Sequence, residues 1–407
     1  MNILDELIHR YCPNGVEFLT LSELFDTRNG YTPSRSNKEY WENGTVPWFR
    51  MEDIRANGGI LSDSLQHVSE CAVKGKVFPA NSLIVATSAT IGEHALITVE
   101  SISNQRFTYL MIKEQYKDKF DMKFLYYYCF KLDSYCLSCL NQGNFASVDM
   151  SKFSKFEFPL VPLPVQIEIV RILDTFTEFT ADLTAELTAE LTARKRQYEH
   201  YRDEILRFNN DVLLKKVKLS DVCKVYDGTH QTPNYTETGI KFASVENIQC
   251  PYNTQKHISV EDYQKYKIKP QIGDVLMTRI GSIGVCYVID RPDDLAYYVS
   301  LALLRPDNKV LDSRYLKHYI ESIQGTKELR KRTLVNAVPI KINKDDIGKI
   351  PILIPPIEVQ KRIVDILDRF NAYSSDISAG LAAEIEARQK QYEYYRDKLL
   401  SFKELSV

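Results

Sequence analysis

The chain has 407 residues, 44% of them apolar, and a formal net charge of −2. This length and apolar content predict at least two domains, each with its own core. No run of about 18 apolar residues occurs, so no membrane-spanning helix is expected. The start, Met1–Cys12, is acidic and amphipathic, unlike a secretory signal. Eight cysteines without framework spacing indicate reduced thiols and a cytoplasmic protein.

Residues 1–12 predict a short helix that ends at Pro13-Asn14-Gly15. We assign residues 13–161 to a first globular domain of short strands, loops and some helix. The strands predicted there are Val46–Phe49, Ser82–Ala86 and Phe107–Ile112. The aromatic-rich segment Lys119–Leu140 predicts a helix.

That helix carries a C-x-x-C motif formed by Cys136 and Cys139. A zinc site needs about four ligands, and the sequence offers no second pair and no nearby histidine. We therefore interpret the two cysteines as buried thiols.

Residues 162–208 and 355–407 form two copies of one helical segment. Sliding the chain by 194 positions places Gln166–Phe208 on Gln360–Phe402, with 22 identities in 43 positions and no gap. Apolar residues recur at steps of three and four, which predicts a long helix with a narrow coiled-coil seam. Each copy would span roughly 65 Å. Because like elements pack about a two-fold axis, we expect the two helices to run antiparallel.

The first copy contains the finer repeat L-T-A-E, L-T-A-E, L-T-A-R over residues 183–194. Adding or removing four residues turns a helix by about 40° and changes its length by about 6 Å. The seam survives such a change as a stutter, so the segment is suited to variation in length. The spacer seam residues of the two copies are Leu183, Leu187, Leu191, Ile377, Leu381 and Ile385.

A second globular domain, residues 209–354, repeats the first only in skeleton. Gly30 with Thr32-Pro33 resembles Gly228 with Thr232-Pro233, and the run Asn81–Gly92 corresponds to Gly273–Gly284. The expected fold class is therefore α+β. Two similar mixed α/β domains are separated by two long antiparallel coiled-coil helices in an internal pseudo-two-fold repeat.

This organisation resembles the specificity subunits of type I restriction–modification systems, over nearly the whole chain. The resemblance is carried by the repeated helices, which are entered through Pro162-Leu163-Pro164 and Pro355-Pro356, and by the L-T-A-E units. It also rests on the Gly30 and Gly281-Ser282-Ile283-Gly284 elements, although the first domain has Ala89-Thr90-Ile91-Gly92 at the second of these.

The resemblance implies a DNA-reading subunit without catalytic activity, in which residues 13–161 and 209–354 are target-recognition domains. Each domain would read one half of a bipartite target in double-stranded DNA. The helix pair would set the gap and dock two methyltransferase subunits, which restriction and translocase subunits would join. S-adenosylmethionine, ATP and Mg²⁺ would then belong to the partners. The chain is nearly neutral, and only residues 209–354 have a modest basic excess. A partner would therefore supply much of the charge that neutralises the phosphates.

Candidate DNA contacts are side chains that suit base edges or phosphates in polar, loop-like segments, because arginine pairs with guanine and amides pair with adenine. In the first domain they are Arg28, Tyr31, Arg35, Arg50, Thr87, Ser88, Thr90, Gln105 and Arg106, with Asn104 adjacent. In the second domain they are Thr229, His230, Gln231, Arg279, Ser282, Lys327, Arg330, Lys331 and Arg332. An ordinary solvated surface charge is the competing interpretation for each.

Two other functions remain open at this stage. Pro292-Asp293 and Asp307-Asn308-Lys309 fit the loose outline of a metal-dependent nuclease, but turns at the two ends of the apolar run Val299–Leu304 explain them more simply. No phosphate-binding loop or methyl-donor loop is present. A protein-assembly scaffold without DNA readout is the other alternative, which the acidic helices favour.

Overall fold

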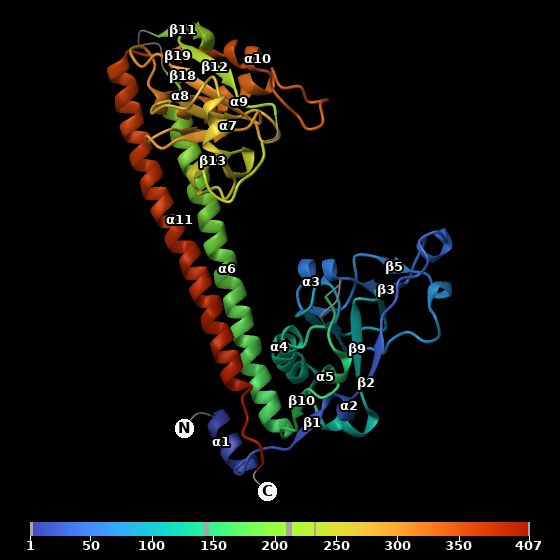
Figure 1. Ribbon diagram of the computed structural model, residues 1–407. Coiled ribbons are helices and arrows are strands. Elements are labelled where there is room, and N and C mark those ends of the chain that lie inside the picture. Colours follow the sequence, from blue (N-terminus) through green and yellow to red (C-terminus); the bar gives the residue numbers. More distant parts are fainter. Residues whose placement is uncertain (1–2, 142–145, 209–213, 232, 406–407) are drawn as a thin grey trace. The chain divides into compact units, whose positions relative to one another are not determined.

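The computed structural model describes residues 3–141, 146–208, 214–231 and 233–405, apart from the side chains of residues 374–378. The chain forms two compact units (Figure 1). Unit 1 comprises Met1–Ala185 and Glu384–Val407, and unit 2 comprises Glu186–Ala383. The boundary between the units falls inside both long helices, α6 (Leu163–Ile205) and α11 (Ile357–Leu399).

In its described residues, unit 1 combines helices with ten short strands. Its other helices are α1 (Ile3–Tyr11), α2 (Leu21–Leu24), α3 (Met51–Asn57), α4 (Met122–Ser138), α5 (Met150–Phe153) and the 3-10 helices η1 (Lys38–Tyr40), η2 (Glu70–Ala72) and η3 (Glu114–Lys119). Its strands are β1 (Phe18–Thr20), β2 (Phe25–Asn29), β3 (Val46–Phe49), β4 (Ile60–Leu61), β5 (His67–Val68), β6 (Ser82–Ala86), β7 (His94–Ile97), β8 (Ile102–Ser103), β9 (Phe107–Ile112) and β10 (Glu157–Pro159).

A five-stranded sheet, ordered β2-β9-β6-β7-β4, forms the centre of unit 1. Its central strand β6 is buried on both faces, because period-two alternation sends Leu83 and Val85 to one side and Ile84 and Ala86 to the other. The first side packs on α4, and the second packs on the small sheet β5-β3-β8. The predicted strands β3, β6 and β9 and the predicted helix α4 are confirmed.

The helices and strands of unit 2 follow the same succession. The further helices are α7 (Val260–Gln264), α8 (Ser313–Glu321), α9 (Ile323–Arg330), α10 (Lys344–Gly348) and the 3-10 helices η4 (Leu219–Asp221), η5 (Val245–Asn247) and η6 (Pro251–Asn253). The strands are β11 (Lys215–Lys218), β12 (Cys223–Asp227), β13 (Ile240–Ala243), β14 (His257–Ile258), β15 (Val275–Thr278), β16 (Cys286–Val288), β17 (Leu295–Tyr297), β18 (Leu301–Pro306) and β19 (Pro351–Ile354).

The sheets of unit 2 repeat those of unit 1. The order β12-β18-β15-β16 matches β2-β9-β6-β7, and β14-β13-β17 matches β5-β3-β8. The pairing senses also match, since β3·β8 and β13·β17 are parallel while β3·β5 and β13·β14 are antiparallel. The prediction that the two globular domains share one fold is confirmed.

One detail of the second domain differs from the prediction. The run Val299–Leu304 is not a single strand with a turn at each end, because Val299 and Ser300 form a turn between β17 and β18. The backbone carbonyl of Asp307, after β18, accepts from the N–H groups of Val310 and Leu311. Asp307 is therefore a turn residue.

The long helices run antiparallel, as predicted, and make equivalent contacts in the two units. In unit 1 the rings of Phe176 and Tyr395 stack at 6.1 Å between centroids. In unit 2 the rings of Tyr201 and Phe370, which are their counterparts in the repeat, lie 5.4 Å apart. The same two repeated positions therefore pair at both places, which is the contact pattern of a pseudo-two-fold repeat.

A buried glutamine near the start of each long helix links that helix to the neighbouring globular domain by hydrogen bonds. The amide group of Gln166 donates to the carbonyls of Lys119 and Val161 and accepts from the N–H of Asp121, the N-cap residue of α4. Gln360 makes the same three bonds in unit 2, to Val310, Pro355 and Asp312, the N-cap residue of α8. Both side chains are fully buried. Each amide thus joins the first turn of a long helix to the first turn of a domain helix.

Eight residues further along, a repeated aspartate joins the same pairs of helices. Asp174 accepts from Lys123 and from the hydroxyl of Tyr127, both at 2.7 Å. Asp368 accepts from Arg314 at 2.8 Å and from His318 at 3.0 Å. The partners differ between the units while the geometry is retained.

Candidate nucleic-acid interface

The loop after β2 in unit 1 is held close to the small sheet by a glycine and two indoles. A Cβ on Gly30 would lie 2.3 Å from the Asn104 carbonyl oxygen, so only glycine fits at this approach. The indole N–H of Trp48 donates to Tyr31 O at 3.1 Å, and that of Trp41 donates to Ser34 O at 3.0 Å. The two rings pack edge to face at 4.9 Å.

Four cations of unit 1 lie over aromatic rings near this loop. The Arg35 guanidinium lies 4.4 Å from the Trp41 centroid and 5.2 Å from that of Trp48, and Arg50 also lies 5.2 Å from Trp48. The other two pairs are Arg28 over Phe78 at 3.9 Å and Lys74 over Tyr31 at 5.6 Å. The sequence-predicted residues Arg28, Tyr31, Arg35 and Arg50 therefore belong to one surface of cations on rings.

The small polar loop after β6 contributes less than its sequence indicated. Thr87 is buried, and its hydroxyl lies 2.9 Å from that of Thr108. Ser88 is half-buried in a bridge with Ser147, and the half-buried Thr90 hydroxyl makes no hydrogen bond among the described residues. Of the three, Thr87 faces the domain interior.

The segment before β9 is exposed and ordered by its own amide group. Asn104 Oδ1 accepts from the Arg106 N–H at 3.0 Å, and Gln105 Oε1 accepts from the Thr32 hydroxyl at 2.6 Å. The side chains of Gln105 and Arg106 are exposed. These two residues lie beside the Gly30 loop and are open to a ligand.

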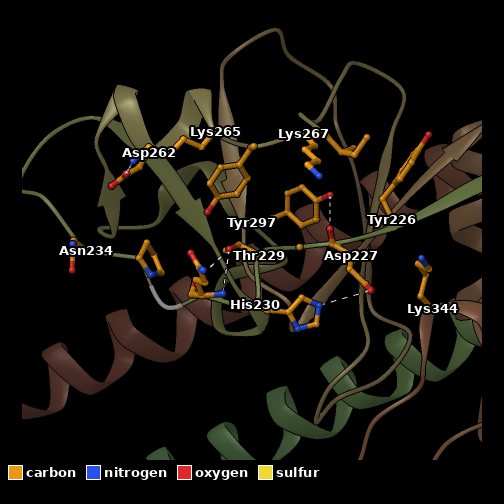
Figure 2. A pocket seen from close by; sticks show the side chains of 15 residues that line it. Tyr226, Asp227, Thr229, His230, Asn234, Asp262, Lys265, Lys267, Tyr297 and Lys344 are labelled. Atoms are coloured by element: carbon orange, nitrogen blue, oxygen red, sulfur yellow. Dashed lines mark hydrogen bonds and ion pairs between the residues drawn. The ribbon is translucent and has the colours of Figure 1, made fainter.

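A pocket of about 550 Å³ lies at the Gly228 loop of unit 2 (Figure 2). Its lining includes Tyr226, Asp227, Thr229, His230, Gln231, Asn234, Asp262, Lys265, Tyr266, Lys267, Tyr297 and Lys344. Figure 2 shows His230 facing Asp227, with 3.9 Å between the His230 Nε2 and Asp227 Oδ2 atoms. Burial raises the pKa of Tyr297 and of Tyr266, so both stay neutral phenols.

The loop residues predicted for this domain meet at that pocket. The Thr229 hydroxyl accepts from the Gln231 N–H at 3.3 Å, while His230 and Gln231 keep exposed side chains. Arg279 does not join them, because its buried guanidinium is paired with Asp227 beneath the loop. Arg279 occupies the position that Thr87 holds in unit 1, and both face inward.

The other predicted residues of unit 2 are Ser282, in the loop after β15, and the basic cluster at the end of α9. Ser282 is exposed after Gly281, which has a φ of +75°. In the basic cluster, Lys331 and Arg332 both bind Glu328 at 2.6 Å. The hydrogen bond from Lys331, followed in effect by that from Arg332, lowers the pKa of the Glu328 carboxyl. Lys327 and Arg330 are exposed and make no ion pair among the described residues.

The structure describes the side chains of all the predicted spacer seam residues except one. Leu183, Leu187 and Leu191 in α6 and Leu381 and Ile385 in α11 are half-buried. The side chain of Ile377 lies outside the described residues.

Comparison with known families assigns the fold. The model of the type I restriction modification DNA specificity domain matches residues 13–193 and 212–387. The chain belongs to this family. Its two globular domains are two DNA specificity domains, one in each matched stretch.

Individual type I specificity subunits are similar over long stretches. The EcoprrI specificity subunit of Escherichia coli is 56% identical over 224 residues, which is 53% of this chain and 56% of that protein. The match thus spans little more than half the length of that relative. A putative type I specificity subunit of Haemophilus influenzae is 33% identical over 70% of this chain and 74% of that protein.

Solved type I structures share the fold. One, from a study of complex assembly and conformational transition of the type I restriction–modification system, has a TM-score of 0.70 at 17% identity. It covers 95% of this chain and 98% of that chain. The HsdS subunit of Thermoanaerobacter tengcongensis has a TM-score of 0.50 at 18% identity, covering 96% and 97%.

Family membership supports the expectation that the chain is a specificity subunit without catalytic activity of its own. Among the described residues, no three His, Cys, Asp or Glu side chains form a metal-binding group. In the same residues no helix is long and apolar enough to cross a membrane. Cys136 and Cys139 are buried free thiols, as predicted, and burial raises the pKa of Cys136 to about 12.

The sequence interpretation missed the aromatic partners of the cations. Trp41 and Trp48 are the only tryptophans in the chain, and they stand among predicted arginines, which was the available signal. The lysines Lys265, Lys267 and Lys344 at the unit 2 pocket carried no such signal, because two separate segments bring them together.

Proposed function

We propose that the chain is the DNA-recognition subunit of a type I restriction–modification complex, and that each domain reads one half of a bipartite target. The observation that carries this is a shared fold with different surfaces. Trp48 in β3 and Arg50 just after it are replaced in unit 2 by Phe242 in β13 and Ser244 just after it. Two readers with different side chains on one framework suit two different half-sites.

The long helices would fix the gap between the half-sites and dock two methyltransferase subunits. Large apolar side chains stay exposed on both helices, which is typical of a protein-binding surface. They are Ile167, Phe176, Phe179 and Tyr201 on α6 and Ile366, Phe370, Tyr373, Tyr394 and Tyr395 on α11. Restriction and translocase subunits would complete the assembly.

The chemistry would then belong to the partners, which would use S-adenosylmethionine, ATP and Mg²⁺. The chain is nearly neutral, so the methyltransferase subunits would supply much of the positive charge along the double-stranded DNA. We place this assembly in the cytoplasm.

The test is to co-express the chain with its neighbouring methyltransferase and map modified adenines by long-read sequencing. A gapped, bipartite motif is the expected result. Absence of a motif, with an active methyltransferase shown to be assembled on the chain, would contradict DNA readout and favour a protein scaffold.

A further inference from the structure

Arg35 and Arg50 are the two cations of unit 1 that share one ring. Both guanidinium centres lie 5.2 Å from the centroid of Trp48, and Arg35 is also 4.4 Å from Trp41. Trp48 is buried, whereas Arg35 is exposed and Arg50 keeps a quarter of its side chain accessible. The indoles therefore form a floor on which two guanidinium groups rest at the surface.

In the described part of the chain, neither arginine is engaged by a close carboxylate: Arg50 makes one loose ion pair, with Glu52, and no hydrogen bond from its Nε. Arg35 makes no ion pair among the described residues, and the carboxylate nearest to Arg50 Nε, that of Glu52, is 3.9 Å away. This distance is too long for a hydrogen bond, and the buried Nε has no partner. A buried donor without a partner calls for an explanation, and a ligand oxygen or nitrogen is one.

The floor itself is fixed by hydrogen bonds. Each indole N–H binds a loop carbonyl, of Tyr31 or Ser34, and the backbone N–H of Arg50 donates to the buried Asp53 carboxylate at 2.6 Å. Arginines that rest on such rings lose little further side-chain freedom when they bind a ligand. A small loss of side-chain freedom favours ligands that need N–H donors in a fixed direction.

The matching place in unit 2 has aromatic rings without arginine. Phe242 replaces Trp48, Ser244 replaces Arg50, and Tyr235 packs on Phe242 with the Lys256 ammonium 5.9 Å from the Tyr235 ring. Lysine offers a point charge rather than a planar pair of donors. The two-arginine floor is thus a property of one domain.

We propose that Arg35 and Arg50 form a guanine-reading site, in which their N–H groups donate to the O6 and N7 atoms of guanine in the half-site of unit 1. This inference rests on the proposed function. Arginine also pairs bidentately with phosphate, but only a contact with base edges reads sequence, and the O6 and N7 atoms of guanine need two parallel donors held in a plane. The floor supplies that plane.

The test replaces each arginine by lysine, giving Arg35→Lys and Arg50→Lys, and maps modified adenines as for the wild type. Lysine keeps the charge and loses the planar pair of donors. At least one variant is expected to accept another base at a guanine position of one half-site, with preference for guanine reduced about tenfold. The other half-site and the gap are expected to stay unchanged.

The matched control is Arg55→Lys, because Arg55 is exposed on α3 in the same unit and pairs with Glu93 at 3.6 Å. Melting temperatures verify that all variants fold. A wild type without a bipartite motif contradicts the proposed function. A bipartite motif that both lysine variants retain, or weaken evenly without a change in base preference, overturns the guanine site alone.

Discussion

Ala89 adopts a φ of +66° in the loop after β6, where the repeat has Gly281 with a φ of +75°. The next glycines of the two loops, Gly92 and Gly284, also share positive φ values. The backbone of the two loops therefore has the same conformation, and having alanine instead of glycine at this position adds strain in unit 1. An alanine with positive φ costs roughly 1 kcal/mol relative to glycine.

Ala89→Gly is expected to raise the free energy of unfolding by about 0.5 kcal/mol, because glycine relieves that strain but is more flexible when unfolded. Urea denaturation of the wild type and the variant measures this difference in the free energy of unfolding. Ala89→Ser is the matched control, since serine keeps the Cβ and should bring no gain. Equal stability of all three proteins would contradict the strain argument.

The Asp368 carboxylate provides a residue-scale prediction about pH. The hydrogen bond from His318, with the charges of His318 and Arg314, lowers the pKa of Asp368 below 3.8. A carboxyl with a lowered pKa stabilises the fold above its unfolded pKa, and this stabilisation is lost as the pH falls through its folded pKa. The wild type should therefore lose its advantage over Asp368→Asn below about pH 4.

Unfolding free energies of both proteins between about pH 2 and 7 test this. Asp365→Asn, an exposed position on the same helix, is the control. A constant difference between wild type and Asp368→Asn over that range would show that the carboxylate contributes no pH dependence.

At the scale of elements, the two buried glutamines explain how helices of different sequence keep one geometry. Replacing Gln166 by leucine would leave two carbonyls and the N–H of Asp121 without this partner in a buried place. Each such loss costs about 1–3 kcal/mol, so we expect the three losses in Gln166→Leu to destabilise unit 1 by at least about 3 kcal/mol in total.

Urea denaturation, monitored by a probe in unit 1, measures the effect of Gln166→Leu. Gln389→Leu on the exposed side of α11, in the same unit, should change stability by less than about 0.5 kcal/mol. A Gln166 variant as stable as this control would mean that water or a shifted backbone satisfies the three groups.

The sequence predicted the elements well where the pattern is local. Helical periodicity and repeat identity located α6 and α11, and apolar runs located β6 and β9. The repeat also marked Gln166 and Gln360, but their burial depends on segments about 50 residues away and has no local signal.

The site was predictable only in part for the same reason. Arg35 and Arg50 stood out by residue type, but their two indoles come together only when η1 and β3 pack. Thr87 and Arg279 had the expected chemistry, yet the fold turns both toward partners inside the domain. Which of the exposed candidates touch bases stays a prediction.

For the whole molecule, the proposed function makes the length of α6 a measurable property. Removing Leu187–Glu190, one L-T-A-E unit, shortens the helix by about 6 Å, against 3.4 Å of rise per base pair. The expected result is a gap shorter by one or two base pairs with both half-sites unchanged, measured from the modified adenines.

Inserting one further L-T-A-E unit is the matched experiment and should lengthen the gap by the same amount. Altered half-sites with an unchanged gap in either variant would contradict the role of the helices as a ruler.

Unit 1 is assembled from the two ends of the chain. Lys131 binds the carbonyl of Leu400, and the backbone of Val16 pairs with Lys403 and Leu405. During synthesis on the ribosome these last residues emerge after all of Glu186–Ala383 has been made. The unit that is begun first is therefore completed last. The hydrophobic core of unit 1 therefore stays incomplete until translation has passed residue 400, and until then chaperones and proteases can reach it.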